Sequence, residues 1–120
     1  MTPVEFEKRH FFAEGVYARE LTIPAGVCLV GRMHKQSQIN IISKGDISVL
    51  TGSEVLRIKA PYTLVTPPGV KRAGFAHEET VWTTILGTDE TDPDRIYELL
   101  TLNGPSEHEL LTHIGDSDGI

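Results

Sequence analysis

The chain has 120 residues, of which 39% are hydrophobic and 23% charged, and its formal net charge is −6. This length is sufficient for one domain with a single hydrophobic core. The excess of acidic residues argues against binding to a nucleic-acid polymer or to an anionic membrane, but it is compatible with a small anion held in a locally basic pocket.

Cysteine content and the N-terminal segment narrow the class of protein further. Cys28 is the only cysteine, which excludes an intrachain disulfide and a cysteine-rich zinc site. Its apolar neighbours predict a buried thiol. The N-terminal residues lack a basic segment followed by an apolar run, and no window is long enough to span a bilayer, so a cytoplasmic protein is expected.

The first part of the chain predicts a short helical arm followed by strands. Thr2, Pro3 and Glu5 fit the start of a helical segment that Gly15 would end. Beyond it, alternating apolar and polar residues are punctuated by turns about every ten residues, as in an antiparallel sandwich or barrel. The predicted strands cover residues 16–23, 27–31 with an extension to 34, 38–42, 47–51, 54–60, 63–66, 71–74 and 80–86.

The character of the sequence changes near residue 91. Asp92 fits a helix cap, Pro93 fits the first helical position, and residues 103–105 stop the helix. Ser106 and Glu109 form a second capping box, which predicts another short helix. We therefore divide the chain into a β-barrel with an N-terminal arm, residues 1–90, and a helical tail, residues 91–120, that packs on the barrel or trails from it.

One polar stretch organises the predicted barrel. In an extended chain, Arg32 and His34 share one face, and Gln38 and Asn40 share a face of the next strand. A guanidinium, an imidazole and two carboxamides therefore converge on a small volume, which predicts a polar pocket inside the barrel.

This stretch, residues 31–46, resembles the first motif of the cupin family, and residues 67–72 resemble the second. The resemblance implies a cupin-like antiparallel β-barrel, the double-stranded β-helix or jelly roll. The family's four metal positions fall on Arg32, His34, Gln38 and Arg72. Only His34 among them is a good metal ligand, so the resemblance implies the fold but a metal-poor pocket.

Four further segments look like those of small single-domain cupins found in phages and prophages. They are residues 16–20, 39–45, 68–72 and 80–84. This resemblance implies a homodimer, and a host cytoplasm if the protein is phage-encoded. Such proteins have no settled activity, so the resemblance implies a fold rather than a function.

Two interpretations of Arg32 and Arg72 remain open at this point. Buried guanidinium groups need partners. The partner is either an internal acid, with Glu20, Glu78 and Glu79 as candidates, or an anionic ligand. In the second case the expected ligand-binding residues are Arg32, His34, Gln38, Asn40, Arg72, His77, Trp82 and Tyr17.

Three functions follow from these interpretations. The preferred one is non-catalytic binding of a small anionic ligand, phosphorylated or nucleotide-like, with sequestration of a host nucleotide signal as one use. The second is a metal-dependent cupin enzyme, of the oxygenase or isomerase type, with His34, Gln38 and His77 as the only plausible ligands. The third is a structural or interaction module without a ligand. We expect no catalytic residue and no cofactor.

Overall fold

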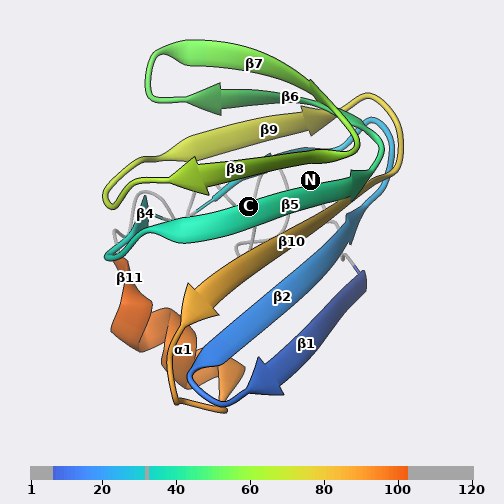
Figure 1. Cartoon of the computed structure of the whole chain (residues 1–120). Helices are drawn as coiled ribbons and strands as arrows, with labels where there is room; N and C mark the ends of the chain where they lie inside the picture. Colours follow the sequence, from blue (N-terminus) through green and yellow to red (C-terminus); the bar gives the residue numbers. More distant parts are fainter. Residues whose placement is uncertain (1–6, 32, 103–120) are drawn as a thin grey trace.

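The structure is a computed structural model that describes residues 7–31 and 33–102. Antiparallel strands dominate it and one short helix follows them (Figure 1), so the predicted fold class is confirmed. Within the described part, no helix is long and apolar enough to cross a membrane. The elements are β1 (Glu7–Ala13), β2 (Val16–Ile23), β3 (Cys28–Val30), β4 (Met33–His34), β5 (Gln38–Lys44), β6 (Asp46–Thr51), β7 (Glu54–Lys59), β8 (Tyr62–Thr66), β9 (Arg72–Ala76), β10 (Thr80–Gly87), α1 (Pro93–Leu100) and β11 (Thr101–Leu102).

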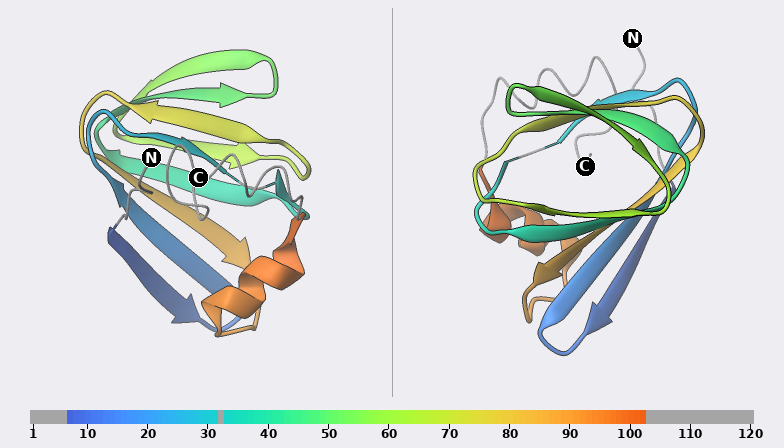
Figure 2. Two further views of the ribbon diagram at one scale, coloured as in Figure 1. Left: turned by 180° about the vertical axis from the view of Figure 1, so that it is seen from behind. Right: turned by 45° about the horizontal axis from the view of Figure 1, so that its top comes forward.

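The strands form two main sheets and a short pair. One sheet has the order β1-β2-β10-β5-β8, the other has the order β3-β9-β6-β7, and β11 pairs with β4. In the right-hand view of Figure 2 the strands β5 to β9 run around an oval, while β10, β2 and β1 extend the larger sheet to one side. The inward faces of the two main sheets enclose the interior of the barrel.

The alternation read from the sequence matches the burial of the strands. On β2 and β10 every second side chain is buried, as expected where one face of a sheet covers a core. Residues from both main sheets form the core, among them Leu21, Ile42, Ile47 and Trp82, all fully buried. Cys28 does not join them: it faces outward on β3 beside the buried Leu29, so the predicted buried thiol is exposed.

The predicted helical arm is wrong for the residues that the structure describes. Residues Glu7–Ala13 form β1, which pairs with β2 from Glu7 opposite Thr22 to Ala13 opposite Val16. A two-residue turn with Gly15 at φ 75° joins the two strands. Pairing along β2 thus overrode the local helix signal, whose first residues, 2–6, lie outside the described part.

Gly45 marks the point where the chain passes from one main sheet to the other. It lies between β5 and β6 with φ 105°, and a Cβ there would lie 2.5 Å from the Glu79 carbonyl oxygen. The sequence Lys44-Gly45-Asp46 predicts a turn that closes a hairpin, and this prediction is wrong because β5 and β6 belong to different sheets and do not pair. A glycine is required at position 45 by both backbone angle and space.

The C-terminal helix begins where the sequence predicts. Asp92 Oδ1 accepts a hydrogen bond from the Asp94 amide at 3.0 Å, which caps α1. Ile96 packs with Tyr17 and Leu86, so the helix lies against the ends of β2 and β10. The helix ends at Leu100, before the predicted stop, and β11 follows it. The second predicted helix lies outside the described residues.

Candidate functional site

Polar side chains gather on the inward faces of six strands. We call them the interior polar group, and each is at most 4% exposed. Strand register and hydrogen bonds connect six of the seven from one sheet to the other, and the seventh, His34, is close enough for the charges of Arg19 and Arg72 to act on it. The group consists of Arg19 on β2, His34 on β4, Gln38 and Asn40 on β5, Thr66 on β8, Arg72 on β9 and Thr84 on β10.

Asn40 is the centre of the hydrogen-bond network in this group. Its Oδ1 accepts hydrogen bonds from Trp82 Nε1 and Thr84 Oγ1, both at 2.9 Å, and its Nδ2 donates to Thr66 Oγ1 at 3.1 Å. An indole N–H only donates, which fixes the orientation of the amide. The predicted site residue Asn40 is therefore inside the barrel, but its hydrogen bonds go to the protein.

Arg72 is a buried cation without an acidic partner in the described part of the chain. It is 2% exposed, its Nη1 donates to Thr66 Oγ1 at 2.9 Å, and its Nη2 has no described hydrogen-bond partner. Burial lowers the pKa of Arg72 to about 10, with a further contribution from the charge of Arg19. The guanidinium therefore remains charged at neutral pH.

The acids expected to pair with Arg72 lie elsewhere. Glu20 binds Arg9 at 2.9 Å and Glu79 binds Lys44 at 2.7 Å, in both cases with the base at the surface. Glu78 is exposed. The internal ion pair, one of the two interpretations left open for Arg72, is thus not formed with any of these three acids.

His34 and Gln38 bring further unpaired polar atoms to the same interior. Within residues 7–31 and 33–102, neither His34 Nδ1 nor Gln38 Oε1 has a hydrogen-bond partner. Burial, followed by the charges of Arg19 and Arg72, lowers the pKa of His34 to about 4. The imidazole is therefore neutral at pH 7, and it contributes hydrogen-bonding capacity rather than charge.

The sequence analysis missed Arg19 as a site residue. Arg19 is opposite Thr84 in the β2–β10 register, and its Nη1 donates to the Tyr97 hydroxyl at 3.0 Å. Its guanidinium carbon lies 5.5 Å from the centroid of the Tyr97 ring. The signal was present, because alternation placed Arg19 on the same strand face as the buried Tyr17 and Leu21.

Several predicted ligand contacts do not join the interior polar group. His77 is exposed, its Nε2 lies 2.7 Å from Ser48 Oγ, and its ring packs edge-on against Phe75. Tyr17 belongs to the cluster under α1, with its hydroxyl 2.7 Å from His10 Nδ1. Arg32 lies outside the described residues.

Trp82 is also no platform for a ligand ring. It is fully buried, the guanidinium of Arg72 lies over its ring at 5.4 Å, and its N–H is bound to Asn40. Trp82 was expected among the ligand-binding residues, but its ring is occupied by an internal cation–π contact with Arg72.

The donor chemistry of the group does not fit a metal ion. Where the structure describes the chain, no cluster of three or more histidine, cysteine, aspartate or glutamate side chains forms. The guanidinium of Arg72 offers no lone pair and would repel a cation. The alternative ligand set of His34, Gln38 and His77 is wrong, because His77 is exposed in the bend after β9 while His34 and Gln38 are buried.

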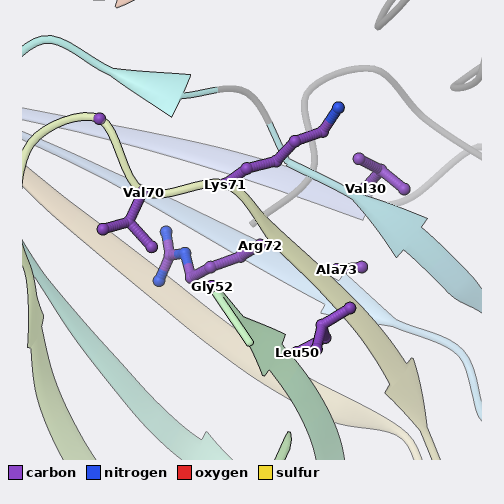
Figure 3. A pocket seen from close by; sticks show the side chains of 8 residues that line it. Val30, Leu50, Gly52, Val70, Lys71, Arg72 and Ala73 are labelled. Atoms are coloured by element: carbon purple, nitrogen blue, oxygen red, sulfur yellow. The ribbon is translucent and has the colours of Figure 1, made fainter. Parts of the chain in front are cut away.

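A cavity of about 380 Å³ is lined by Arg72 together with residues of β3, β6, β9 and the loop before β9 (Figure 3). Figure 3 shows Arg72 extending away from Val30 and Ala73, toward Val70, while Lys71 points the opposite way. Arg72 is the one member of the interior polar group that lines this cavity, and the other lining residues are mainly apolar, with the charged Lys71 among them. Its lining is Val30, Leu50, Gly52, Gly69, Val70, Lys71, Arg72 and Ala73.

Comparison of the sequence with family models and with curated proteins gives no match. Solved structures do match in three dimensions. An RmlC-like cupin from Shewanella frigidimarina has a TM-score of 0.63 at 15% identity, over 75% of this chain and 80% of the other. KdgF from a Halomonas species has a TM-score of 0.62 at 14% identity, over 72% and 82%. A conserved protein of unknown function from Streptococcus pyogenes has a TM-score of 0.60 at 16% identity, over 72% and 77%.

Proposed function

Starting from a chain that has the cupin fold but holds a buried guanidinium in its barrel, we propose that the protein binds a small anionic ligand there without transforming it. The main support for this proposal is the state of Arg72. Its charge is buried, one of its two terminal nitrogens has no described partner, and the group around it contains no carboxylate.

The energetics of buried charge support this assignment. An uncompensated buried charge costs a folded protein several kcal/mol, on the order of 3–5, so a fold normally supplies a counter-ion. The one fully or nearly fully buried carboxylate that the described residues contain, Asp46, binds Arg57 instead. An anion bound in the barrel would supply the missing negative charge and would accept a hydrogen bond from the unpaired N–H of Arg72.

The same side chains argue against catalysis. The histidine of the interior polar group, His34, has a pKa of about 4, so it is a weak general base at neutral pH. The hydroxyl groups of Thr66 and Thr84 are engaged with Asn40. None of the described residues pairs a nucleophile with an activating base in this interior, so binding is the activity that the chemistry supports best.

The ligand class is a phosphorylated or other compact oxyanion. Since Trp82 is covered by Arg72, a nucleotide bound here would have to place its base away from the indole. A phosphate or carboxylate group matches the donor geometry of a guanidinium, which can offer two parallel N–H groups.

A melting-temperature screen tests the proposal. Wild-type protein would be screened with inorganic phosphate, phosphate monoesters, nucleotides and carboxylic acids, followed by calorimetry on every hit. Arg72→Met removes the buried charge, and Lys71→Met is the matched control, since it removes the same charge from an exposed neighbour. Stabilisation of wild type and Lys71→Met but not of Arg72→Met is expected. An equal shift in all three, or no shift in wild type, contradicts the proposal.

A further inference from the structure

The interior polar group contains acceptors as well as the free donor of Arg72. Gln38 is 2% exposed and His34 is 3% exposed, and both carry a buried polar atom that no described residue satisfies. Leaving such an atom unpaired costs on the order of 1–3 kcal/mol. A carboxamide oxygen is only an acceptor, so an anion by itself would not satisfy Gln38 Oε1.

Two of the three unpaired atoms belong to neighbours of Thr66. Gln38 is directly opposite Thr66 in the β5–β8 register, and Arg72 Nη1 binds Thr66 Oγ1. The main chain of His34 is tied to the turn before β9, because its carbonyl oxygen accepts the Gly69 amide at 2.9 Å. Gln38 and Arg72 therefore bring an unpaired acceptor and an unpaired donor to the neighbourhood of one threonine.

From this arrangement we infer that the ligand carries a hydroxyl group close to its anionic group, and that Gln38 accepts a hydrogen bond from that hydroxyl while Arg72 binds the anion. This inference rests on the proposed function and narrows it to hydroxylated oxyanions, such as hydroxyalkyl phosphates or hydroxy acids. His34 Nδ1 is a further unpaired buried atom of the interior polar group.

Matched ligand pairs test the inference. Glycerol 3-phosphate and propyl phosphate differ in hydroxyl groups, and lactate and propionate differ in one. The four probes also separate a phosphate source from a carboxylate source. Calorimetric dissociation constants would be measured for wild type, for Gln38→Met, which removes the acceptor at similar size, and for Gln36→Met. Gln36 is the control because its side chain donates to the Gly87 carbonyl, outside the interior polar group.

The expected result is a preference of about tenfold or more for the hydroxylated member of one pair in wild type and Gln36→Met. In Gln38→Met the preference falls to near unity, while Arg72-dependent binding of the plain anion persists. Equal affinity for both members in wild type, or an unchanged preference in Gln38→Met, overturns the inference and leaves anion binding intact. If none of the four probes binds in a manner that depends on Arg72, both the inference and the proposed function fail for these ligand classes.

Discussion

The guanidinium of Arg72 lies over the indole ring of Trp82, with 5.4 Å between the guanidinium carbon and the ring centroid, and the two side chains come from opposite sheets. This contact holds a charge against the apolar core of the barrel without neutralising it. The side chains of the barrel interior differ in their hydrogen bonding. Asn40 makes its hydrogen bonds within the protein, whereas His34, Gln38 and Arg72 each keep a polar atom without a partner among the described residues.

Arg72→Met is expected to leave the free energy of unfolding unchanged or to raise it, by about 1–4 kcal/mol, in ligand-free protein. Replacing a buried charge with an apolar side chain of similar length removes its desolvation cost, and Thr66 keeps its hydrogen bond from Asn40. Urea unfolding beside Lys71→Met measures the effect. A loss of more than about 2 kcal/mol specific to Arg72→Met would indicate a structural role for this arginine.

Asn40→Leu is expected to destabilise the fold by about 3 kcal/mol, because it leaves the Trp82 and Thr84 donors unsatisfied inside the core. The indole N–H would have no acceptor among the remaining described contacts. Chemical unfolding monitored by Trp82 fluorescence gives the value, and Gln36→Leu provides a half-exposed amide for comparison. A cost below about 1 kcal/mol would show that the network is dispensable.

Stability is expected to fall as the pH drops from about 6.5 to about 4, through His34. The folded pKa is about 4 and the ordinary value is 6.5, so in this window the unfolded chain binds a proton that the folded chain refuses. The total loss is about 3 kcal/mol, and stability is recovered as the pH rises to 6.5. Unfolding curves of wild type and His34→Gln across this pH range measure the loss of stability. A nuclear magnetic resonance titration measures the pKa of His34 directly. A midpoint above 6 in that titration would refute the lowered pKa.

Gly45→Ala is expected to lower the free energy of unfolding much more than Gly52→Ala does, although both glycines have positive φ. A Cβ at Gly45 meets backbone atoms at 2.5–2.6 Å, whereas nothing lies within 4 Å of one at Gly52. The Gly52 variant therefore reports backbone strain alone, about 1 kcal/mol, and the Gly45 variant adds overpacking of about 1–3 kcal/mol. Similar melting temperatures for the two variants would mean that the chain relaxes freely between the sheets.

The alternation of apolar and polar residues along the strands predicted the fold and much of the candidate site. It placed His34, Gln38 and Asn40 on inward faces, and the resemblance to the second cupin motif indicated Arg72; all four side chains are buried in the structure. The inward alternation of β9 ends at Ala76, and His77 lies in the exposed bend that follows, where strand alternation no longer applies.

Local sequence patterns do not contain the pairing between distant segments of the chain. The residues before β1 have the pattern of a helix cap, but hydrogen bonding of β1 along the edge of β2 determined the conformation. Arg19 was overlooked for a related reason. An arginine in a strand is usually exposed, and its burial depends on Tyr97, 78 residues further along the chain.

The hydroxyl of Thr66 is fixed by its neighbours. Its oxygen already receives two hydrogens, one from Asn40 and one from Arg72, and so both of its lone pairs are filled. What remains is its own proton, which has no acceptor among the described residues and is held in place by two neighbours. Thr66 and Arg72 therefore offer only hydrogen-bond donors here, while the unpaired acceptors of the interior polar group are on Gln38 and His34.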